Sequence, residues 1–210
     1  MTMKKVILAL AAVAMLSLTS QAQVKFGAKA GMNLSRFTEN FETMKPGFHG
    51  GVYAQVKLHS MFSIQPEVLY SMQGATEEET NTTLGQTITA KGSVTSHNVI
   101  VPVMLQFTPI KPITIEVGPQ FGFNLGMSLY SEVTMSGLVD DSFEDSVDLE
   151  SDDYKMFDFG LAAGLKYNVT SNINVYARYV FGLTPVFEYE EDYDDATMNQ
   201  NLMFGVGFAF

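Results

Sequence analysis

The 210-residue sequence lacks cysteine and tryptophan, and charged residues make up only 17% of it, against about 25% in a typical soluble domain. The absence of cysteine excludes disulfides, thiolate metal sites, a cysteine nucleophile and an acylated lipoprotein anchor. Basic residues are also scarce, with 12 Lys and Arg against 23 Asp and Glu and a formal net charge of −11. This balance disfavours a nucleic-acid-binding protein, because phosphate neutralisation requires clustered cations.

The first 22 residues have the three parts of a secretory signal peptide. Lys4 and Lys5 precede an apolar run at residues 6–18, and a small-residue cleavage motif ends at Ala22. The run is shorter than the roughly 20 residues of a transmembrane helix. The order of the parts predicts export and cleavage after Ala22, with a buried N-terminal helix as the alternative. Residues 23–210 are then expected to form one domain.

An alternation of apolar and polar or small residues dominates the rest of the chain, as expected for strands. In the last segment, residues 202–210, bulky apolar side chains occupy every second position and Gly or other small residues fall between them. Seven earlier segments repeat the pattern: residues 24–34, 48–58, 62–73, 97–107, 113–129, 156–167 and 173–183. Each is about long enough for a tilted strand to cross a bilayer.

A soluble lipocalin-like barrel also alternates, with its apolar face inside, so the connections must decide between the two. Those after the second, fourth and sixth segments are short, and those after the first, third, fifth and seventh are long. Tight turns alternating with long loops are typical of outer-membrane barrels. The prediction is an all-β, eight-stranded antiparallel transmembrane β-barrel with short periplasmic turns and long acidic outer loops.

Eighteen of the 23 acidic residues fall in three of the long connections, at 77–79, 132–153 and 188–195. Such runs are usually solvated surface. The alternative is a divalent-cation site, because Ca²⁺ prefers several carboxylate oxygens, although EF-hand spacing is absent. Candidate ligands are Asp140, Asp141, Asp145, Asp152 and Asp153. Bridging of the cation to lipopolysaccharide phosphates is a variant of this hypothesis.

Charged residues also occur on the polar faces of the predicted strands. An eight-stranded barrel is only wide enough for side chains to fill, so these residues are expected to pair in a polar network that fills the interior. The alternative is a narrow proton or ion path. The predicted interior residues are Lys25, Lys29, Lys57, Glu67, Glu116, Asp158, Lys166 and Arg178.

Catalytic motifs are missing from the sequence. It contains neither GxSxG nor HExxH. Its three histidines are His49, His59 and His97, and the last has Ser93 and Ser96 nearby in sequence. The prediction is a protein that is not an enzyme, with no catalytic residue and no cofactor.

Several strings resemble the PorT-like outer-membrane β-barrel family of Bacteroidota. They are GAKAGMNLS (27–35), KPGFHGGVYA (45–54), SIQPEVLYSMQG (63–74), VIVPVMLQF (99–107), EVGPQFGF (116–123), FDFGLAAGLKY (157–167) and VYARYVFGLTPV (175–186). The resemblance implies an eight-stranded barrel in the outer membrane and little about chemistry. The family's namesake acts in the secretion of other proteins through the outer membrane.

The expected role is structural or a surface interaction, in the cell outer membrane. The alternatives are an accessory component of protein secretion or envelope assembly, and a narrow ion channel. Expected partners are outer-membrane lipid, a protein or polysaccharide at the outer loops, and the outer-membrane assembly machinery. This machinery typically reads a final strand that ends in an aromatic residue, as Phe210 does here.

Overall fold

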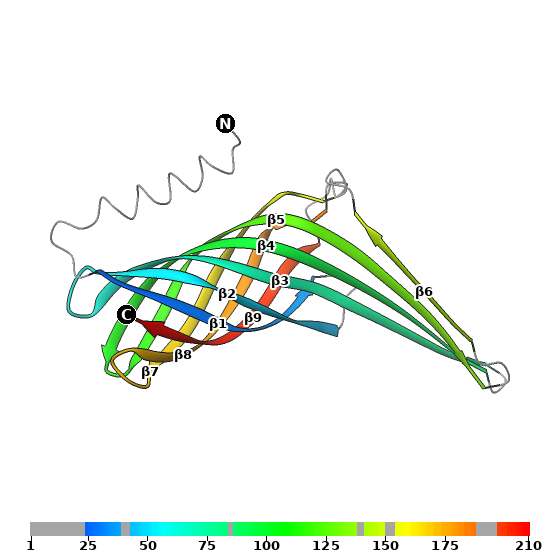
Figure 1. Cartoon of the computed structure of the whole chain (residues 1–210), viewed down its shortest axis with the longest axis horizontal. Coiled ribbons are helices and arrows are strands. Elements are labelled where there is room, and N and C mark those ends of the chain that lie inside the picture. The colour runs from blue at the N-terminus through cyan, green and yellow to red at the C-terminus, as the bar shows by residue number, and fades with distance from the viewer. Residues whose placement is uncertain (1–23, 39–42, 84–85, 138–140, 150–153, 188–196) are drawn as a thin grey trace.

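The computed structural model describes residues 24–38, 43–83, 86–137, 141–149, 154–187 and 197–210. The predicted signal peptide lies outside these residues. Nine antiparallel strands occur in the described ranges (Figure 1). They are β1 (Val24–Phe37), β2 (Thr43–Lys57), β3 (Phe62–Thr83), β4 (Gln86–Ile110), β5 (Ile113–Ser136), β6 (Asp141–Asp148), β7 (Phe157–Asn168), β8 (Ile173–Pro185) and β9 (Met198–Ala209).

Eight of these strands close into a ring. Each pairs with its neighbour in the order β1, β2, β3, β4, β5, β7, β8, β9, and β9 pairs with β1. Closure leaves no free edge within the ring, so backbone donors and acceptors are satisfied between strands. The predicted eight-stranded antiparallel barrel is confirmed, and each predicted segment overlaps one strand of the ring.

Strand alternation separates the outer wall from the lumen. In β8, exposed and buried residues alternate along almost the whole strand. Val175 and Phe181 point outward and are about 42% exposed, whereas Tyr176 and Arg178 point inward and are buried. The outer wall is therefore apolar and uncovered, as expected for a surface that contacts hydrocarbon.

Aromatic pairs mark both ends of this apolar wall. At the end that carries the short turns, which we call the turn end, Phe62 stacks on Phe107 with ring centroids 5.0 Å apart. Toward the opposite or outer end, Phe48 lies 5.7 Å from Tyr70. Such aromatic residues are typical of the boundary between hydrocarbon and headgroups. The described residues include no helix long and apolar enough to span a membrane.

The outer ends differ from the prediction of long loops. Strands β3, β4 and β5 continue past the ring, and the ninth strand, β6, pairs with the outer half of β5. In Figure 1 these four strand ends project together on one side of the barrel. We call this four-stranded sheet the extension; it comprises residues 75–83, 86–95, 128–136 and 141–148. In the described strands, one edge of the extension is the outer half of β3 and the other is β6.

The prediction that the acidic runs form loops was wrong for the described residues. Glu77 to Glu79 lie in β3, Glu132 in β5, and Asp141 to Asp148 in β6. The backbone of each of these segments pairs with a neighbouring strand, although the acidic side chains face water. The acidic run at 188–195 lies outside the described residues.

Glycines on the inner face of β9 make room for bulky neighbours. A Cβ at Gly205 would lie 2.6 Å from the Tyr176 hydroxyl, and one at Gly207 would lie 2.7 Å from Oδ1 of Asn174. The alternation of large outward and minimal inward residues in β9 thus allows side chains of β8 to fill the lumen.

Replacing Val117 by Arg tests the position of the hydrocarbon. Val117 lies on the outer wall beside Leu105 and Ala163 and is 50% exposed. We expect Val117→Arg to lower the free energy of unfolding in lipid vesicles by about 1–3 kcal/mol, because a cation on a lipid face costs about 2–4 kcal/mol at mid-depth and less toward the interface. Urea titration of the refolded barrel measures it.

Val147 is the matched control, because it is 53% exposed but lies on β6 of the extension. Val147→Arg should change the same free energy by less than about 0.5 kcal/mol, as at most water-exposed sites. Equal losses for the two variants would contradict the proposed lipid-facing wall.

Candidate functional site

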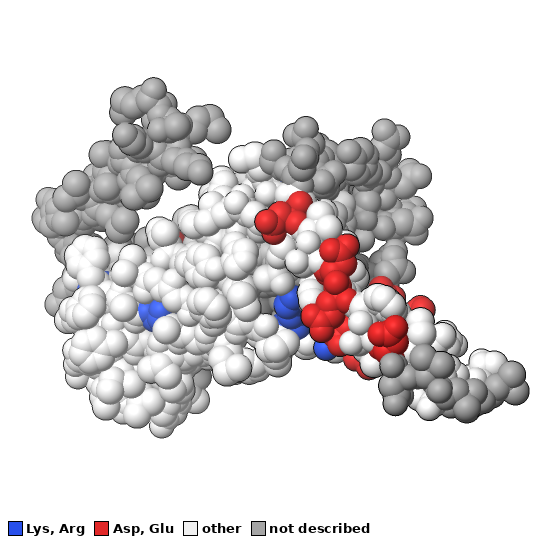
Figure 2. All heavy atoms as spheres, turned by 45° about the vertical axis from the view of Figure 1, so that its right-hand side comes forward, with Lys and Arg blue, Asp and Glu red and all other residues white. Residues whose placement is uncertain are grey.

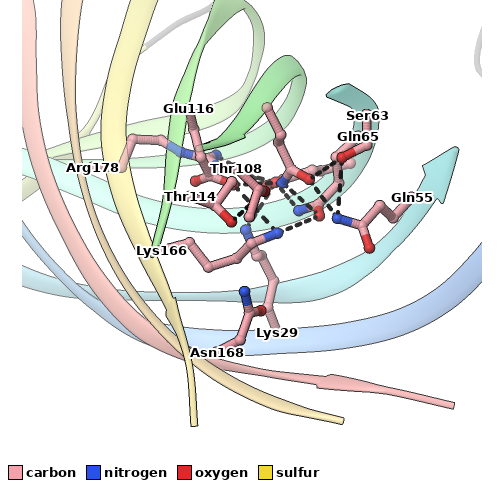
Figure 3. A network of polar contacts seen from close by, with 12 residues as sticks. Lys29, Gln55, Ser63, Gln65, Thr108, Thr114, Glu116, Lys166, Asn168 and Arg178 are labelled. Atoms are coloured by element: carbon pink, nitrogen blue, oxygen red, sulfur yellow. Dashed lines mark hydrogen bonds and ion pairs between the residues drawn. The ribbon is translucent and has the colours of Figure 1, made fainter. Parts of the chain in front are cut away.

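Five charged side chains from five different strands meet inside the barrel (Figure 3). Each stands at an inward position of its strand, so strand alternation directs all of them into the lumen. We call them the lumen network: Lys29 (β1), Glu67 (β3), Glu116 (β5), Lys166 (β7) and Arg178 (β8).

The centre of the lumen network is the pair between Arg178 and Glu67. The Arg178 guanidinium donates from Nη1 to Oε2 of Glu67 at 3.0 Å and from Nη2 to Oε1 at 2.8 Å. Strands β8 and β3 are separated by three strands in either direction around the ring. The pair therefore spans the lumen and joins opposite walls in the bidentate geometry that makes such contacts strong.

Further donors complete both carboxylates. Glu67 Oε1 accepts from Lys29 Nζ at 2.8 Å and from Gln65 Nε2 at 2.8 Å. Glu116 accepts from Arg178 Nη2 at 3.2 Å and from Gln106 Nε2 at 2.6 Å. Buried ions are tolerated only when they are paired and hydrogen-bonded in this way.

The lumen network is also packed against aromatic rings. Lys29 Nζ lies 4.0 Å from the centre of the Tyr176 ring, a cation–π contact. The Tyr176 hydroxyl hydrogen-bonds Nε2 of His49, and Nδ1 of His49 bonds Oδ1 of Asn33 at 2.6 Å. His49 is 1% exposed, so it extends the polar filling toward the outer end.

An apolar cluster lies nearer the outer end of the lumen. It joins residues of the barrel wall and of the base of the extension to the chain segments that follow β6 and β8. An isolated bridge pairs Tyr154 with Phe187. Its buried members are Phe37, Ala75, Val94, Met127 and Tyr154. The described part of the lumen thus holds ion-paired groups and, nearer its outer end, this apolar cluster.

Three predicted network residues lie elsewhere. Lys25 is exposed at the turn end. Asp158 lies toward the outer end, where its Oδ1 accepts from the Thr184 hydroxyl at 2.9 Å. Lys57, also predicted inside, lies beside Lys25 in a cavity at the turn end. Sequence alternation did not single out Gln65 and Gln106, which link the two carboxylates, because neutral amides are common on any polar face.

The candidate cation ligands are only partly described. Asp141 and Asp145 are exposed on β6, and Asp140, Asp152 and Asp153 lie outside the described residues. Among the residues that the structure describes, no three His, Asp or Glu side chains are grouped closely enough to hold a metal ion. The divalent-cation site stays a prediction.

The serines near His97 do not form a catalytic arrangement with it. Ser96 and His97 are consecutive in β4, so their side chains point to opposite faces of the sheet. The His97 ring bonds the Tyr70 hydroxyl at 2.6 Å, and Ser96 accepts from Asn98 Nδ2 at 2.5 Å. Neither contact activates a serine nucleophile.

The extension carries most of the described acidic charge. Its described residues contain eight carboxylates and one lysine, Lys91, and Figure 2 shows the acidic side chains gathered there beside a barrel wall almost free of charge. At the base of the extension, Lys45 Nζ donates to Ser93 and Thr95 at 2.6 and 2.5 Å. Burial, and then repulsion from Lys91, lowers the pKa of Lys45 below its ordinary value.

The two faces of the extension differ. One continues the lumen side of the barrel and carries exposed apolar residues, among them Phe143 at 60% and Val147 at 53% exposure. Pairing places Val133 beside Phe143, and Leu129 beside Val147. We call this side the apolar face; Glu77, Glu79, Asp141 and Asp145 surround its apolar residues.

A closed antiparallel ring with an apolar outer wall and an ion-paired lumen defines a small transmembrane β-barrel. The model of one family, described as outer membrane protein beta-barrel domain, matches residues 19–188. The chain belongs to this family, and the protein is located in the outer membrane. A comparison with curated protein sequences finds no match.

Solved structures of similar fold include Ail of Yersinia pestis, with 15% identity over 89% of this chain and 99% of Ail and a TM-score of 0.43. Neisserial surface protein A shares 14% identity over 91% of this chain and 100% of its own, with a TM-score of 0.47. The N-terminal β-barrel domain of OprF from Pseudomonas aeruginosa shares 17% over 90% and 100%, with a TM-score of 0.37. These similarities concern the fold alone.

A double-mutant cycle measures the pair that spans the lumen. We expect Glu67→Gln and Arg178→Met each to lower the free energy of unfolding in vesicles by about 3–5 kcal/mol, because each removes the bidentate partner of a buried charge. The double variant should lose less than the sum, with a coupling of about 0.5–3 kcal/mol.

Asp158→Asn is the control for this cycle. Asp158 is also an inward carboxylate, but no cation lies within ion-pair distance of it among the described residues. Its replacement should cost about 1 kcal/mol, the value of one hydrogen bond. Additive losses at Glu67 and Arg178 would show that the pair does not act as a unit.

The filled lumen also predicts the electrical behaviour. Because the lumen network and the apolar cluster occupy the barrel at two levels, we expect the wild-type protein to give no single-channel steps in planar bilayers. A porin reconstituted by the same procedure is the positive control. Reproducible steps from the purified protein would favour the narrow-channel hypothesis instead.

Proposed function

We propose that this chain is a non-enzymatic outer-membrane barrel that binds a protein partner at the cell exterior through the apolar face of its extension. The observation that supports this role is the exposure of Phe143, Val147 and Ile88, at 60, 53 and 40%, on a sheet beyond the barrel wall. Outside the membrane no lipid covers such residues, and contiguous exposed apolar residues often mark interaction sites.

The charge around these residues indicates the kind of partner. Glu77, Glu79, Asp141 and Asp145 surround the apolar residues and stand on the same side of the sheet. A surface with an apolar centre and a ring of Lys and Arg would be complementary to it, since complementary potentials at the edge of an interface steer association and select partners.

Resemblance to the PorT-like family supports a second role, as an accessory component of protein secretion or envelope assembly. That resemblance rests on the seven motifs of the barrel strands. A secretion accessory is expected to contact its complex at the turn end, in place of the extension. The position of the contacts therefore separates the two roles.

Site-specific photocrosslinking in the native envelope tests the proposal. A photoreactive residue at Phe143 should give an adduct with a protein, whereas one at Val206 on the lipid-facing wall should not. The variant with Glu77→Gln, Glu79→Gln and Asp145→Asn should reduce the yield at Phe143 severalfold, because charge complementarity contributes to association.

A third crosslinker, at His59 in the turn between β2 and β3, distinguishes the alternative. Protein adducts at His59 without any at Phe143 would favour the secretion or assembly role. An absence of adducts at Phe143 above the level at Val206 would overturn the proposed interaction surface.

A further inference from the structure

A cavity of about 520 Å³ lies inside the turn end of the barrel, opposite the extension. Residues of the three short turns line it, including His59, Lys111 and Thr170, and the adjoining ends of several strands form its wall. Its volume is within the range of roughly 300–1,000 Å³ typical of small-molecule sites. We call this cavity the vestibule.

The charge of the vestibule has one sign. Four lysines line it, Lys25, Lys57, Lys111 and Lys166, and no described lining residue is Asp or Glu. The lysines come from β1, β2, the turn between β4 and β5, and β7, so they stand at different places around the ring. A cleft or cavity lined by charges of one sign concentrates ions of the opposite sign.

Lys166 connects the vestibule to the lumen network. It is only 5% exposed, yet its ammonium is 3.9 Å from Oε1 of Glu116 and donates at 3.3 Å to Oε1 of Gln65. Both contacts are long. The buried ammonium therefore retains hydrogen-bonding capacity toward the vestibule.

The lumen network below the vestibule does not neutralise these lysines. Its three cations, Lys29, Lys166 and Arg178, exceed its two carboxylates, Glu67 and Glu116. Both carboxylates are already engaged by Arg178. The turn end therefore carries uncompensated positive charge, although the whole chain is strongly acidic.

Neutral polar groups complete the wall. Thr114, Asn174 and Tyr53 line the vestibule and are 1, 7 and 5% exposed. Hydroxyls and amides beside ammonium groups are suited to phosphate oxygens, which accept several hydrogen bonds at once. A carboxylate offers fewer acceptor oxygens for four widely placed lysines.

We propose that the vestibule is a binding site for a phosphate-bearing anion on the periplasmic side. Lys25, Lys57, Lys111 and Lys166 supply the charge, and the polar residues of the wall orient the phosphate. This site is independent of the extension and of the partner proposed there. The phosphate belongs either to a soluble molecule or to the headgroup of an anionic lipid at the barrel rim.

Titration with inorganic pyrophosphate tests the site in neutral maltoside micelles at low ionic strength. We expect saturable binding by the wild-type protein, and about tenfold weaker binding by the double variant Lys25→Gln, Lys57→Gln, because two exposed charge contacts are lost. Both lysines are exposed, so their replacement leaves the barrel folded, as its heat-modifiable migration in gels can verify.

The double variant Lys45→Gln, Lys91→Gln is the matched control, since it removes the same charge near the outer end. It should bind pyrophosphate as the wild type does. Absence of saturable binding by the wild type, or equal losses in the two double variants, would overturn the proposal.

Nanodiscs distinguish the two sources of phosphate. If the ligand is a lipid headgroup, phosphatidylglycerol in a phosphatidylcholine disc should weaken pyrophosphate binding through competition, and the Lys25, Lys57 variant should abolish this effect. If the ligand is soluble, binding should be the same in both discs. Either result supports a phosphate site.

Discussion

The contact between Arg178 and Glu67 constrains the whole barrel, because it joins walls on opposite sides of the ring. A bidentate pair in a buried lumen is favourable only if the walls hold both groups at one distance and one height. Ring closure provides this constraint, and Gly164 of β7, which pairs with Arg178, provides part of the space. The ion pairing in the lumen therefore depends on the residues that the strands place around it.

The lumen changes character along its axis. Apolar residues fill its outer part, ion pairs its middle, and a lysine-lined cavity its turn end. The two candidate sites are therefore on opposite sides of a packed interior. Because described side chains of the lumen lie between the two sites, we expect any coupling between them to pass through the strands themselves.

The sequence predicted which side of the barrel wall each residue faces better than it predicted the position of that residue along the barrel axis or the length of the strands. Hydrocarbon on one side and ion pairs on the other enforce a strict period of two, so the eight segments of the ring were recognisable. The same parity correctly directs Lys25 and Asp158 inward. It cannot give their height along the barrel axis, which depends on the stagger between strands, and both lie away from the lumen network.

The sequence did not predict the extension for a related reason. Outside the membrane a strand does not need apolar residues at every second position, because no hydrocarbon contacts it. Glu77 to Glu79 interrupt the alternation and still lie in a strand.

The two edges of the extension have backbone groups that another strand could pair with, and both carry carboxylates. Glu77 to Glu79 lie along the edge formed by β3, and Asp141, Glu144, Asp145 and Asp148 lie along the edge formed by β6. Two copies that approached edge to edge would bring like charges together, which opposes the continuous pairing that leads to aggregation. The acidic residues therefore oppose edge-to-edge pairing between copies of this protein in the membrane. They leave the edges accessible to a strand of opposite charge.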